Sequence, residues 1–230
     1  MSNIPILSLR NVESRFLGAL KLSDVCIDVN QGELVSILGA NGAGKTSLLG
    51  AIAGLYRISQ GEIRLDGQPI NGLPPHRIAR MGVGFAPQNH PIFNSLTVAE
   101  SLELGRPNTQ IDILALFPNL VSKRGQRAAA LSGGERQMLS MAIALQNDPR
   151  ICIFDEPSSG LAPKIVAQVF EAIKAMIDAG ITVLMVEQNA RAALRYAARA
   201  YVMEHGRIVA GGIASDLASD DQIRRAYLGM

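Results

Sequence analysis

The sequence has little excess charge of either sign. Its 230 residues include 22 Lys and Arg against 20 Asp and Glu, a formal net charge of +2, and the basic residues form no concentrated tail. Binding to the phosphate backbone of DNA or RNA depends on a strongly basic surface. We therefore expect no nucleic-acid partner.

Long apolar runs are also missing. The longest stretch without charged residues, 81–99, contains two prolines, two asparagines, a glutamine and a histidine, which a membrane-spanning helix does not accommodate. The opening segment, MSNIPILSLRN, turns polar too early for an export signal. We expect a chain that is not exported and that reaches a membrane only through a partner.

Cysteine and histidine are scarce. Cys26 and Cys152 lie far apart, each within an apolar run, which favours reduced thiols in the core of a cytosolic protein. The histidines, His76, His90 and His205, have no spacing typical of a metal site and are expected in loops or at the surface. Neither residue type predicts a metal centre.

Hydrophobic residues, by contrast, make up 48% of the chain, which argues against disorder and suffices for one large domain or two small ones. Alternating apolar residues at 25–29 and 63–65 predict half-buried antiparallel strands. The run LVSIL at 34–38 predicts a strand that leads into a helix, and the runs at 151–154 and 181–186 are typical of buried parallel strands.

Helical patterns separate these runs. Thr97 and Glu100 form a capping-box pattern, which predicts a helix start in a mostly helical middle that extends to about Ala130. Near the end of the chain, YVMEHGRIV predicts a hairpin that turns at 205–206. Ser219 and a glutamine three residues later predict a final helix that ends near 228.

We interpret the whole chain, 1–230, as one α/β domain. It combines a P-loop NTPase core that contains a parallel sheet, an antiparallel β subdomain, and an inserted helical subdomain at about 92–150.

A glycine-rich segment follows the strand predicted at 34–38. Its residues, GANGAGKT, have the spacing of a phosphate loop between a strand and a helix. The glycines let backbone N–H groups converge on a phosphate, Lys45 adds a positive charge near the β- and γ-phosphates, and the Thr46 hydroxyl can ligate Mg²⁺. We predict a nucleoside triphosphate site formed by Gly39, Ala40, Asn41, Gly42, Ala43, Gly44, Lys45, Thr46 and Ser47.

The segment ICIFDEP adds two carboxylates after a strand. Asp155 can hold the coordination shell of Mg²⁺, and Glu156 can orient and deprotonate a water for attack on the γ-phosphate. Such a pair is often only part of a solvated loop, but a phosphate loop in the same chain favours the catalytic interpretation.

A second glycine turn, LSGGERQ, lies between these motifs. Ser132 and Glu135 form a capping box there, which explains the serine and the glutamate but not the glycines between them. Each glycine in a helix costs about 1 kcal/mol relative to alanine. What the glycines provide is bare backbone N–H groups, and room for an approaching anion, at the positive end of a helix.

These three motifs, in this order, resemble the ATP-binding subunit of an ABC transporter, and the resemblance runs from about Leu7 to Leu228. The segments LPPHRIARMGV, DEPSSGLAP, VEQNA and AYLG further resemble the smaller ATPase subunit of branched-chain amino-acid importers. Urea-type importers are near relatives that these segments leave open. The resemblance implies ATP and Mg²⁺ as cofactors and ATP hydrolysis as the activity.

The resemblance also implies roles for single residues. Phe16 would stack on adenine, although a core phenylalanine is the other interpretation, and Gln88 would contact Mg²⁺ and the attacking water. Gln188 replaces the histidine of most ABC ATPases and would contact the γ-phosphate without becoming a cation. We therefore predict Glu156, as general base, and Gln188 as catalytic residues. The predicted metal ligands are Thr46, Gln88 and Asp155.

Three features depart from the family pattern. Ala162 stands where many ABC ATPases have an aspartate that faces the opposite subunit. Gln88 follows the general pattern where many branched-chain-type subunits are expected to have a glutamate, and the helical insertion is short. Because the insertion contacts the membrane subunit in this family, these departures leave the transported solute open.

The resemblance finally implies an assembly. The signature turn would contact the γ-phosphate of ATP on a second ATPase subunit, identical or different, so that two sites are shared across a two-fold axis. Two membrane-spanning permease subunits, and indirectly a solute-binding protein, would complete an importer whose ATPases lie peripherally on the cytoplasmic face of the inner membrane. The alternatives are an importer of urea or another solute, and a non-transport ABC ATPase. The predicted contact residues are Leu131, Ser132, Gly133, Gly134 and Glu135.

Overall fold

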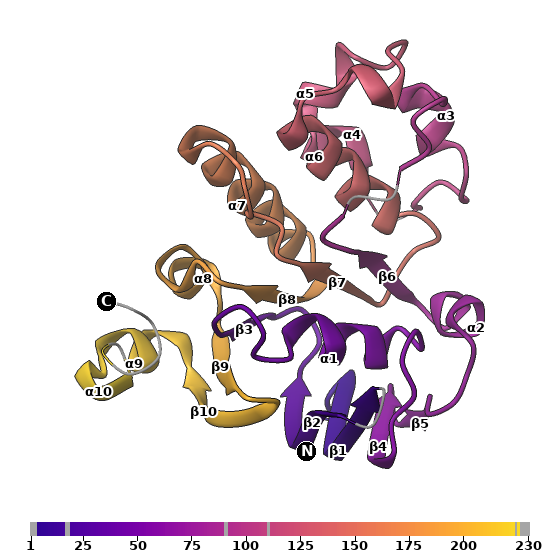
Figure 1. Ribbon diagram of the computed structural model, residues 1–230. Helices are drawn as coiled ribbons and strands as arrows, with labels where there is room; N and C mark the ends of the chain where they lie inside the picture. The colour runs from indigo at the N-terminus through magenta and orange to yellow at the C-terminus, as the bar shows by residue number, and fades with distance from the viewer. Residues whose placement is uncertain (1–3, 17–18, 90–91, 110, 224, 226–230) are drawn as a thin grey trace.

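The computed structural model describes residues 4–16, 19–89, 92–109, 111–223 and 225. These residues form two β-sheets with helices packed around them (Figure 1). In the described part of the chain, no helix combines the length and the apolar character that crossing a membrane requires.

The first sheet is antiparallel, with the strand order β2-β1-β4-β5. Apolar side chains alternate along it as predicted: Val25, Ile27 and Val29 are buried, and so are Ile63 and Leu65. The strands are β1 (Leu7–Phe16), β2 (Ala19–Val29), β4 (Gln60–Leu65) and β5 (Gln68–Pro69).

The prediction that both cysteines lie in the core is wrong for Cys26. Its side chain is exposed, and its sulfur accepts a hydrogen bond from the Asn11 N–H at 3.2 Å. The residue sits between Val25 and Ile27 in β2, so the period of two along a strand turns it to the opposite face. Cys152, in β7 of the second sheet, is fully buried as predicted, and burial raises the pKa of its thiol.

The second sheet has the strand order β10-β9-β3-β8-β7-β6. All neighbouring pairs are parallel except β9 and β10, which form the hairpin predicted at 205–206. Every residue of β3, β7 and β8 is buried, as expected for strands covered on both faces. The strands are β3 (Leu34–Leu38), β6 (Val83–Ala86), β7 (Ile151–Asp155), β8 (Thr182–Glu187), β9 (Arg199–Glu204) and β10 (Arg207–Ile213).

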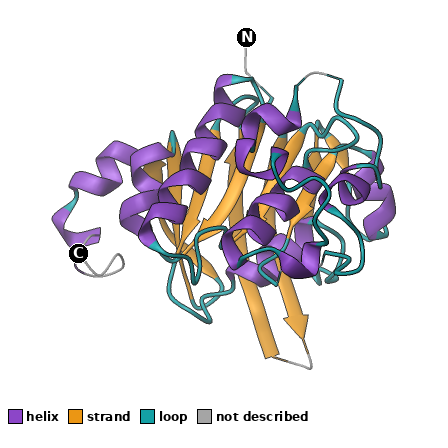
Figure 2. Cartoon of the chain, turned by 90° about the horizontal axis from the view of Figure 1, so that it is seen from above, coloured by secondary structure: helices purple, strands orange, loops and turns teal. Residues whose placement is uncertain are grey.

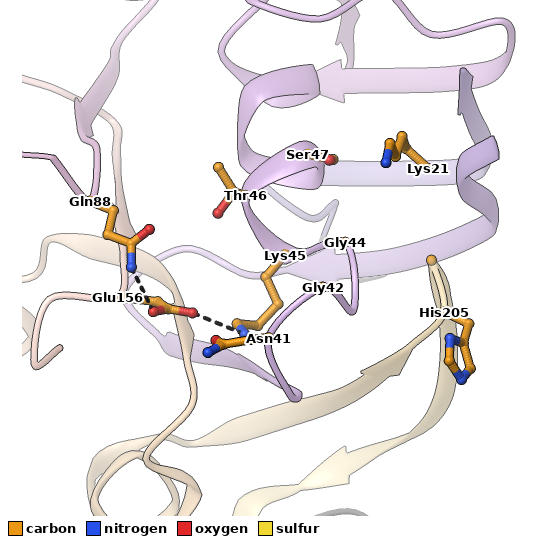
Figure 3. A pocket seen from close by; sticks show the side chains of 11 residues that line it. Lys21, Asn41, Gly42, Gly44, Lys45, Thr46, Ser47, Gln88, Glu156 and His205 are labelled. Atoms are coloured by element: carbon orange, nitrogen blue, oxygen red, sulfur yellow. Dashed lines mark hydrogen bonds and ion pairs between the residues drawn. The ribbon is translucent and has the colours of Figure 1, made fainter. Parts of the chain in front are cut away.

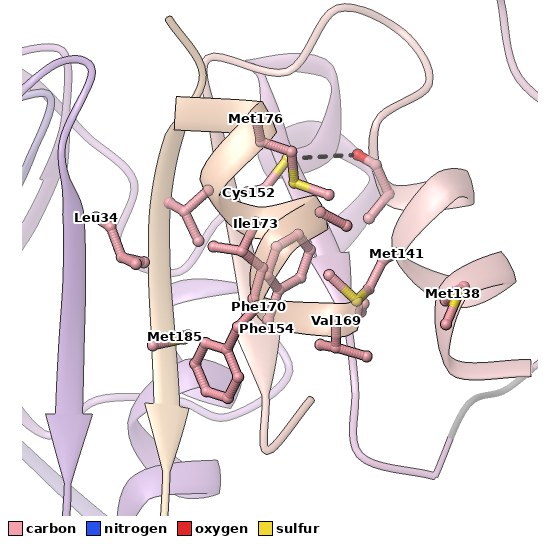
Figure 4. Close-up of a cluster of buried hydrophobic side chains, with 14 of the residues drawn as sticks. Leu34, Met138, Met141, Cys152, Phe154, Val169, Phe170, Ile173, Met176 and Met185 are labelled. Carbon is pink, nitrogen blue, oxygen red and sulfur yellow. Dashed lines mark hydrogen bonds between the residues drawn. The ribbon is translucent and has the colours of Figure 1, made fainter. Parts of the chain in front are cut away.

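Helices cover the strands of both sheets (Figure 2). Helix α1 (Lys45–Ile52) is packed between the two sheets, where its apolar residues join a core shared by β1, β2 and β3. On the other face of the second sheet, α6 (Gly133–Ala144) and α7 (Pro163–Asp178) enclose a second core around Phe154, Phe170 and Met141 (Figure 4). The ends of β3, β7 and β8 are thereby held rigidly beside α1.

The middle of the chain is helical but broken into short pieces, which stand together at the top of Figure 1. Thr97 and Glu100 form the predicted capping box at the first of these helices. The pieces are α3 (Val98–Leu102), α4 (Ile113–Leu116), α5 (Pro118–Val121) and a 3₁₀ turn at Ala128–Ala130. The remaining helices are α2 (Pro75–Arg80), α8 (Ala190–Tyr196), α9 (Ala214–Ser219) and α10 (Asp221–Ile223).

The C-terminal helices differ from the prediction. Ser219 ends α9, and its hydroxyl donates to the Asp216 carbonyl instead of capping a new helix. Asp220 takes the capping role, since its Oδ1 accepts from the Ile223 N–H at 3.1 Å. The side chain of Gln222, and the predicted helix end at Leu228, lie outside the described residues.

Candidate nucleotide site

The glycine-rich loop connects β3 to α1, as its sequence predicts. Gly42 and Gly44 adopt φ values of 82° and 108°, which L-residues rarely take. A side chain at Gly39 would collide with the Met203 carbonyl oxygen of β9. The glycines are thus needed for the backbone path, and this path exposes N–H groups at the N-terminus of α1.

Lys45 opens α1 and its side chain turns back over the loop. The ammonium group donates to the carbonyl oxygens of Gly39 at 2.8 Å and Ala40 at 3.1 Å. It also lies 3.0 Å from Glu156 Oε1, and both side chains are less than one-tenth exposed. The Lys45 ammonium group is therefore held in place by three oxygens.

Asp155 ends β7 and faces Thr46 across the sheet edge. The Thr46 hydroxyl donates to Asp155 Oδ1 at 3.2 Å, which brings together two of the predicted metal ligands. Burial raises the pKa of the Asp155 carboxyl, a hydrogen bond from Thr46 lowers it, and the neighbouring Glu156 charge raises it. A carboxylate with a destabilised negative charge, next to a hydroxyl, is a suitable environment for a hard divalent cation.

Glu156 follows immediately in a left-handed backbone conformation with a φ of 49°. This conformation is uncommon outside glycine and turns the side chain toward the phosphate loop. There Glu156 Oε2 accepts a hydrogen bond from Gln88 Nε2 at 2.9 Å, while Oε1 faces Lys45 (Figure 3). Gln88 and Glu156, 68 positions apart in the chain, are thus in direct contact.

These residues line a cavity of about 600 Å³ beside the phosphate loop (Figure 3). Three of its lining residues were not predicted as site residues from the sequence, Lys21 of β2 and the hairpin-turn residues His205 and Gly206. The turn reaches the loop because the Gly206 N–H donates to the Ala43 carbonyl at 2.7 Å. No local pattern marks Lys21 or His205, since only the folded chain brings β2 and the hairpin to this loop. Of the other predicted histidine positions, His76 is exposed and His90 lies outside the described residues.

The signature turn, Leu131 to Glu135, lies at the start of α6 and is described completely. Its capping box is present: the Glu135 side chain accepts from the Ser132 N–H at 2.8 Å, and the Ser132 hydroxyl accepts from the Glu135 N–H at 3.4 Å. No residue of this turn is among those that line the nucleotide cavity of the described chain.

The two glycines of the turn have different surroundings. A side chain at Gly133 would meet open space, whereas one at Gly134 would collide with Ile165 of α7. The prediction that both glycines make room for an approaching group therefore needs correction. Packing against α7 explains Gly134, and only Gly133 keeps an open approach.

Gln188, the second predicted catalytic residue, is not among the described residues that line the nucleotide cavity. Gln188 follows β8, is exposed, and lines a neighbouring cavity of about 490 Å³ that also borders Glu156. Phe16 ends β1, but its side chain is outside the described residues. Ala162 is the residue immediately before α7 and belongs to the SSGLAP segment.

A parallel sheet, a phosphate loop that enters a helix, and carboxylates at the end of a neighbouring strand together define a P-loop nucleoside triphosphatase. The family model described as "ABC transporter" matches residues 22–159. The chain therefore belongs to the ABC transporter family.

Individual relatives cover nearly the whole chain. It is 41% identical to the high-affinity branched-chain amino acid transport ATP-binding protein BraG of Pseudomonas aeruginosa, over 97% of this chain and 100% of BraG. It is 36% identical to the lipopolysaccharide export system ATP-binding protein LptB of Haemophilus influenzae, over 97% of each chain. The dimeric post-hydrolysis structure of the cassette MJ0796, bound to ADP and Pi, matches it with a TM-score of 0.80 at 25% identity, over 90% of this chain and 98% of that chain.

Proposed function

We propose that this chain is the ATP-hydrolysing subunit of a membrane importer for branched-chain amino acids. The observation that carries the proposal is the 41% identity to BraG over 97% of this chain and 100% of BraG. The convergence of Lys45, Gln88 and Glu156 beside an intact phosphate loop supports an active ATPase, because a module that only bound nucleotide would not need the carboxylate.

The cavity residues divide the chemistry of hydrolysis among them. Lys45 and the loop N–H groups bind the β- and γ-phosphates, and Glu156 accepts a proton from the attacking water. Gln88 holds Glu156 and can orient the same water through its amide oxygen. Mg²⁺, when bound, would supply positive charge that neutralises the phosphate oxygens. Its protein ligands would be Thr46, Asp155 and Gln88, and one or two carboxylates are sufficient because the phosphates supply further oxygens.

The signature turn supplies the second half of each site. Residues Leu131 to Glu135 contribute nothing to the cavity of their own chain, yet Ser132 and Gly133 are exposed at the N-terminus of a helix. In our proposal they contact the γ-phosphate of ATP held by a partner ATPase in a head-to-tail pair, as Gln188 does within its own chain. ATP binding then closes the pair and hydrolysis opens it, which drives alternating access of the permease.

The remaining assembly follows from the importer assignment. The helical subdomain at about 92–150 contacts one of two permease subunits, and a solute-binding protein delivers the cargo to the permease. The ATPases lie peripherally at the cytoplasmic face of the membrane, and Phe16 stacks on the adenine ring.

A second function has support of its own. LptB, a lipopolysaccharide export ATPase, is 36% identical over the same share of the chain, only slightly less than BraG. An ATPase of lipopolysaccharide export is therefore the second candidate, while urea importers remain the alternative within the importer class.

The test is to isolate the chain with its permease subunits and reconstitute the complex in liposomes. We expect ATP-dependent uptake of leucine, isoleucine or valine with the matching binding protein, and none with the Glu156→Gln complex. Uptake of urea alone would contradict the branched-chain assignment. Copurification with lipopolysaccharide-extracting subunits, without uptake of any amino acid, would establish the second candidate instead.

A further inference from the structure

Glu187, the last residue of β8, is a buried carboxylate to which the hydrolysis chemistry assigns no role. Its side chain is 1% exposed. Glu187 Oε1 accepts a hydrogen bond from the backbone N–H of Ser158 at 2.9 Å, and Oε2 accepts one from the N–H of Asn189 at 3.4 Å. One carboxylate therefore joins two loops that are 31 positions apart in the chain.

The first of these loops is 156–162, which starts with the general base. The Glu156 N–H donates to the Val186 carbonyl at 3.0 Å, so the loop is fastened to the end of β8 at two consecutive points. The next residue outward, Ser159, is exposed and lies with Gly160 at the rim of the neighbouring cavity. This loop is the part of the chain that leads from Glu156 toward the proposed partner subunit.

The second loop begins with Gln188, the proposed γ-phosphate contact. Asn189 follows and caps α8, because its Oδ1 accepts from the Ala192 N–H at 3.1 Å. The hydrogen bond from Asn189 to Glu187 thus closes the turn that contains Gln188, and both Gln188 and Asn189 are exposed.

Burying a carboxylate is costly unless hydrogen bonds compensate it. Burial raises the pKa of the Glu187 carboxyl, while the Ser158 and Asn189 hydrogen bonds lower it. In the described chain no salt bridge is formed by Glu187, and its hydrogen-bond partners are the backbone N–H groups of Ser158 and Asn189 together with the Ser158 side chain. Such an arrangement is expected where a side chain fixes the backbone of two segments at once.

We propose that Glu187 is a positioning residue that couples the loop 156–162 to the turn at Gln188. The inference rests on the proposed function, since it takes the loop as a contact to the partner ATPase and Gln188 as a contact to ATP. Through Glu187, a displacement of the loop at the subunit interface moves the γ-phosphate contact of the same chain. The Glu187 carboxylate thereby couples ATP binding at one shared site to ATP binding at the other.

Two substitutions test whether the positioning role depends on the hydrogen bonds of Glu187 or only on its charge or its volume. Glu187→Gln keeps the size but replaces one acceptor oxygen with an NH₂ group, which faces a backbone N–H and cannot accept from it. Glu187→Asp keeps both oxygens and the charge but is one methylene shorter, so it cannot reach both loops. Glu204→Gln is the matched control, because Glu204 also ends a strand of this sheet but its side chain is 48% exposed, and among the described residues it forms one ion pair, a 3.9 Å approach to His205.

The experiment measures ATP hydrolysis by the assembled transporter as a function of ATP concentration. With two coupled sites the wild-type Hill coefficient approaches 2, and we expect it to fall toward 1 in both Glu187 variants. We also expect kcat to fall about tenfold, while ATP affinity of the isolated subunit changes less than about twofold. The Glu204→Gln complex should behave as the wild type.

The other possible outcomes contradict either the positioning role of Glu187 or the proposed function, and they distinguish the two. A wild-type Hill coefficient and kcat in the Glu187 variants would overturn the positioning role, as would a loss of ATP affinity and thermal stability in proportion to the loss of activity. If Glu187→Gln does not fold, Glu187→Asp carries the same test. A wild-type complex that does not hydrolyse ATP would instead overturn the proposed function, since the control would then be equally inactive.

Discussion

The two glycine-rich turns of this chain both lead into a helix, yet they differ in backbone and in surroundings. In the phosphate loop, Gly42 and Gly44 have positive φ values, and side chains from β7 and from the segment after β6 converge on the loop. In the signature turn, neither Gly133 nor Gly134 has a positive φ, and Gly133 faces open space. The first turn is enclosed by its own chain, and the second is not.

This difference shows that glycines in a turn before a helix can have two different structural roles. Glycine in the phosphate loop provides a backbone conformation that other residues cannot adopt at low cost. Glycine in the signature turn provides space instead, for Ile165 within the chain at Gly134 and, in our proposal, for the ATP of a partner subunit at Gly133, where a side chain would meet open space. A substitution in a site that one chain encloses inactivates the ATP site of that chain. A substitution in the proposed half-site instead inactivates the ATP site that the half-site completes on the partner subunit.

The largest effect is expected at the enclosed site. Glu156→Gln keeps the hydrogen bond to Gln88 but removes the proton acceptor, so steady-state ATP hydrolysis by the assembled complex should fall by about 10²- to 10⁴-fold. ATP binding should persist, as measured by equilibrium binding of a fluorescent ATP analogue. Normal steady-state hydrolysis would show that Glu156 is not the general base.

A smaller loss is expected at the half-site. Ser132→Arg places a long charged side chain where the partner ATP should approach, so hydrolysis in the assembled transporter should fall by about 10²- to 10³-fold. Nucleotide binding to the isolated subunit should change less than about twofold, because the turn does not line the cavity of its own chain. Loss of ATP binding in the isolated subunit would refute the shared-site proposal.

The two glycines of the signature turn should respond in opposite directions. Gly134→Ala places a methyl group against Ile165 and should lower the free energy of unfolding by about 1–3 kcal/mol. Gly133→Ala meets open space and should leave it unchanged or raise it by up to about 1 kcal/mol. Urea unfolding of both variants measures the difference. Equal stability losses would mean that Ile165 does not account for Gly134.

The smallest effect is expected on the free energy of unfolding, when the Asp155 charge beside the phosphate loop is removed. Burial raises the pKa of Asp155, so its ionised form destabilises the folded chain as the pH rises above about 4, where the unfolded carboxyl ionises. Asp155→Asn removes that charge and keeps an acceptor oxygen for Thr46. Without Mg²⁺, the variant should be more stable than wild type at pH 7 by up to about 1 kcal/mol, a typical single-substitution effect.

The pH dependence provides the internal control for this prediction. Below about pH 4 the wild-type carboxyl is neutral in both states, so the two proteins should become equally stable. Urea unfolding at pH 3.5 and pH 7, in a buffer with a metal chelator, gives both values. A variant less stable than wild type at pH 7 would show that the Asp155 charge is compensated within the chain.

Some parts of the site follow from short sequence segments. The phosphate loop, the strand ICIFD and the capping boxes at Thr97 and Ser132 were predicted correctly, because each depends on residues within a few positions of one another, whereas the cap predicted at Ser219 was wrong. Strand β6 was missed, since the four residues VGFA are too few to show a period. Cys26 was misplaced because the apolar character of its neighbours was taken as a sign of burial, although the alternation predicted at 25–29 puts Cys26 on the face opposite Val25 and Ile27.

The sequence by itself therefore determined the class of site, the order of the motifs and the parallel strands, since loop conformation and strand burial depend on local composition. Only the tertiary structure decided which side chains meet. Gln88 contacts Glu156, His205 reaches the phosphate loop, Ile165 fills the space beside Gly134, and Glu187 joins two loops. Gln88 and Glu156 are 68 positions apart and Glu187 and Ser158 are 29 apart, and the sheet order that brings such residues together is set by packing across the whole chain.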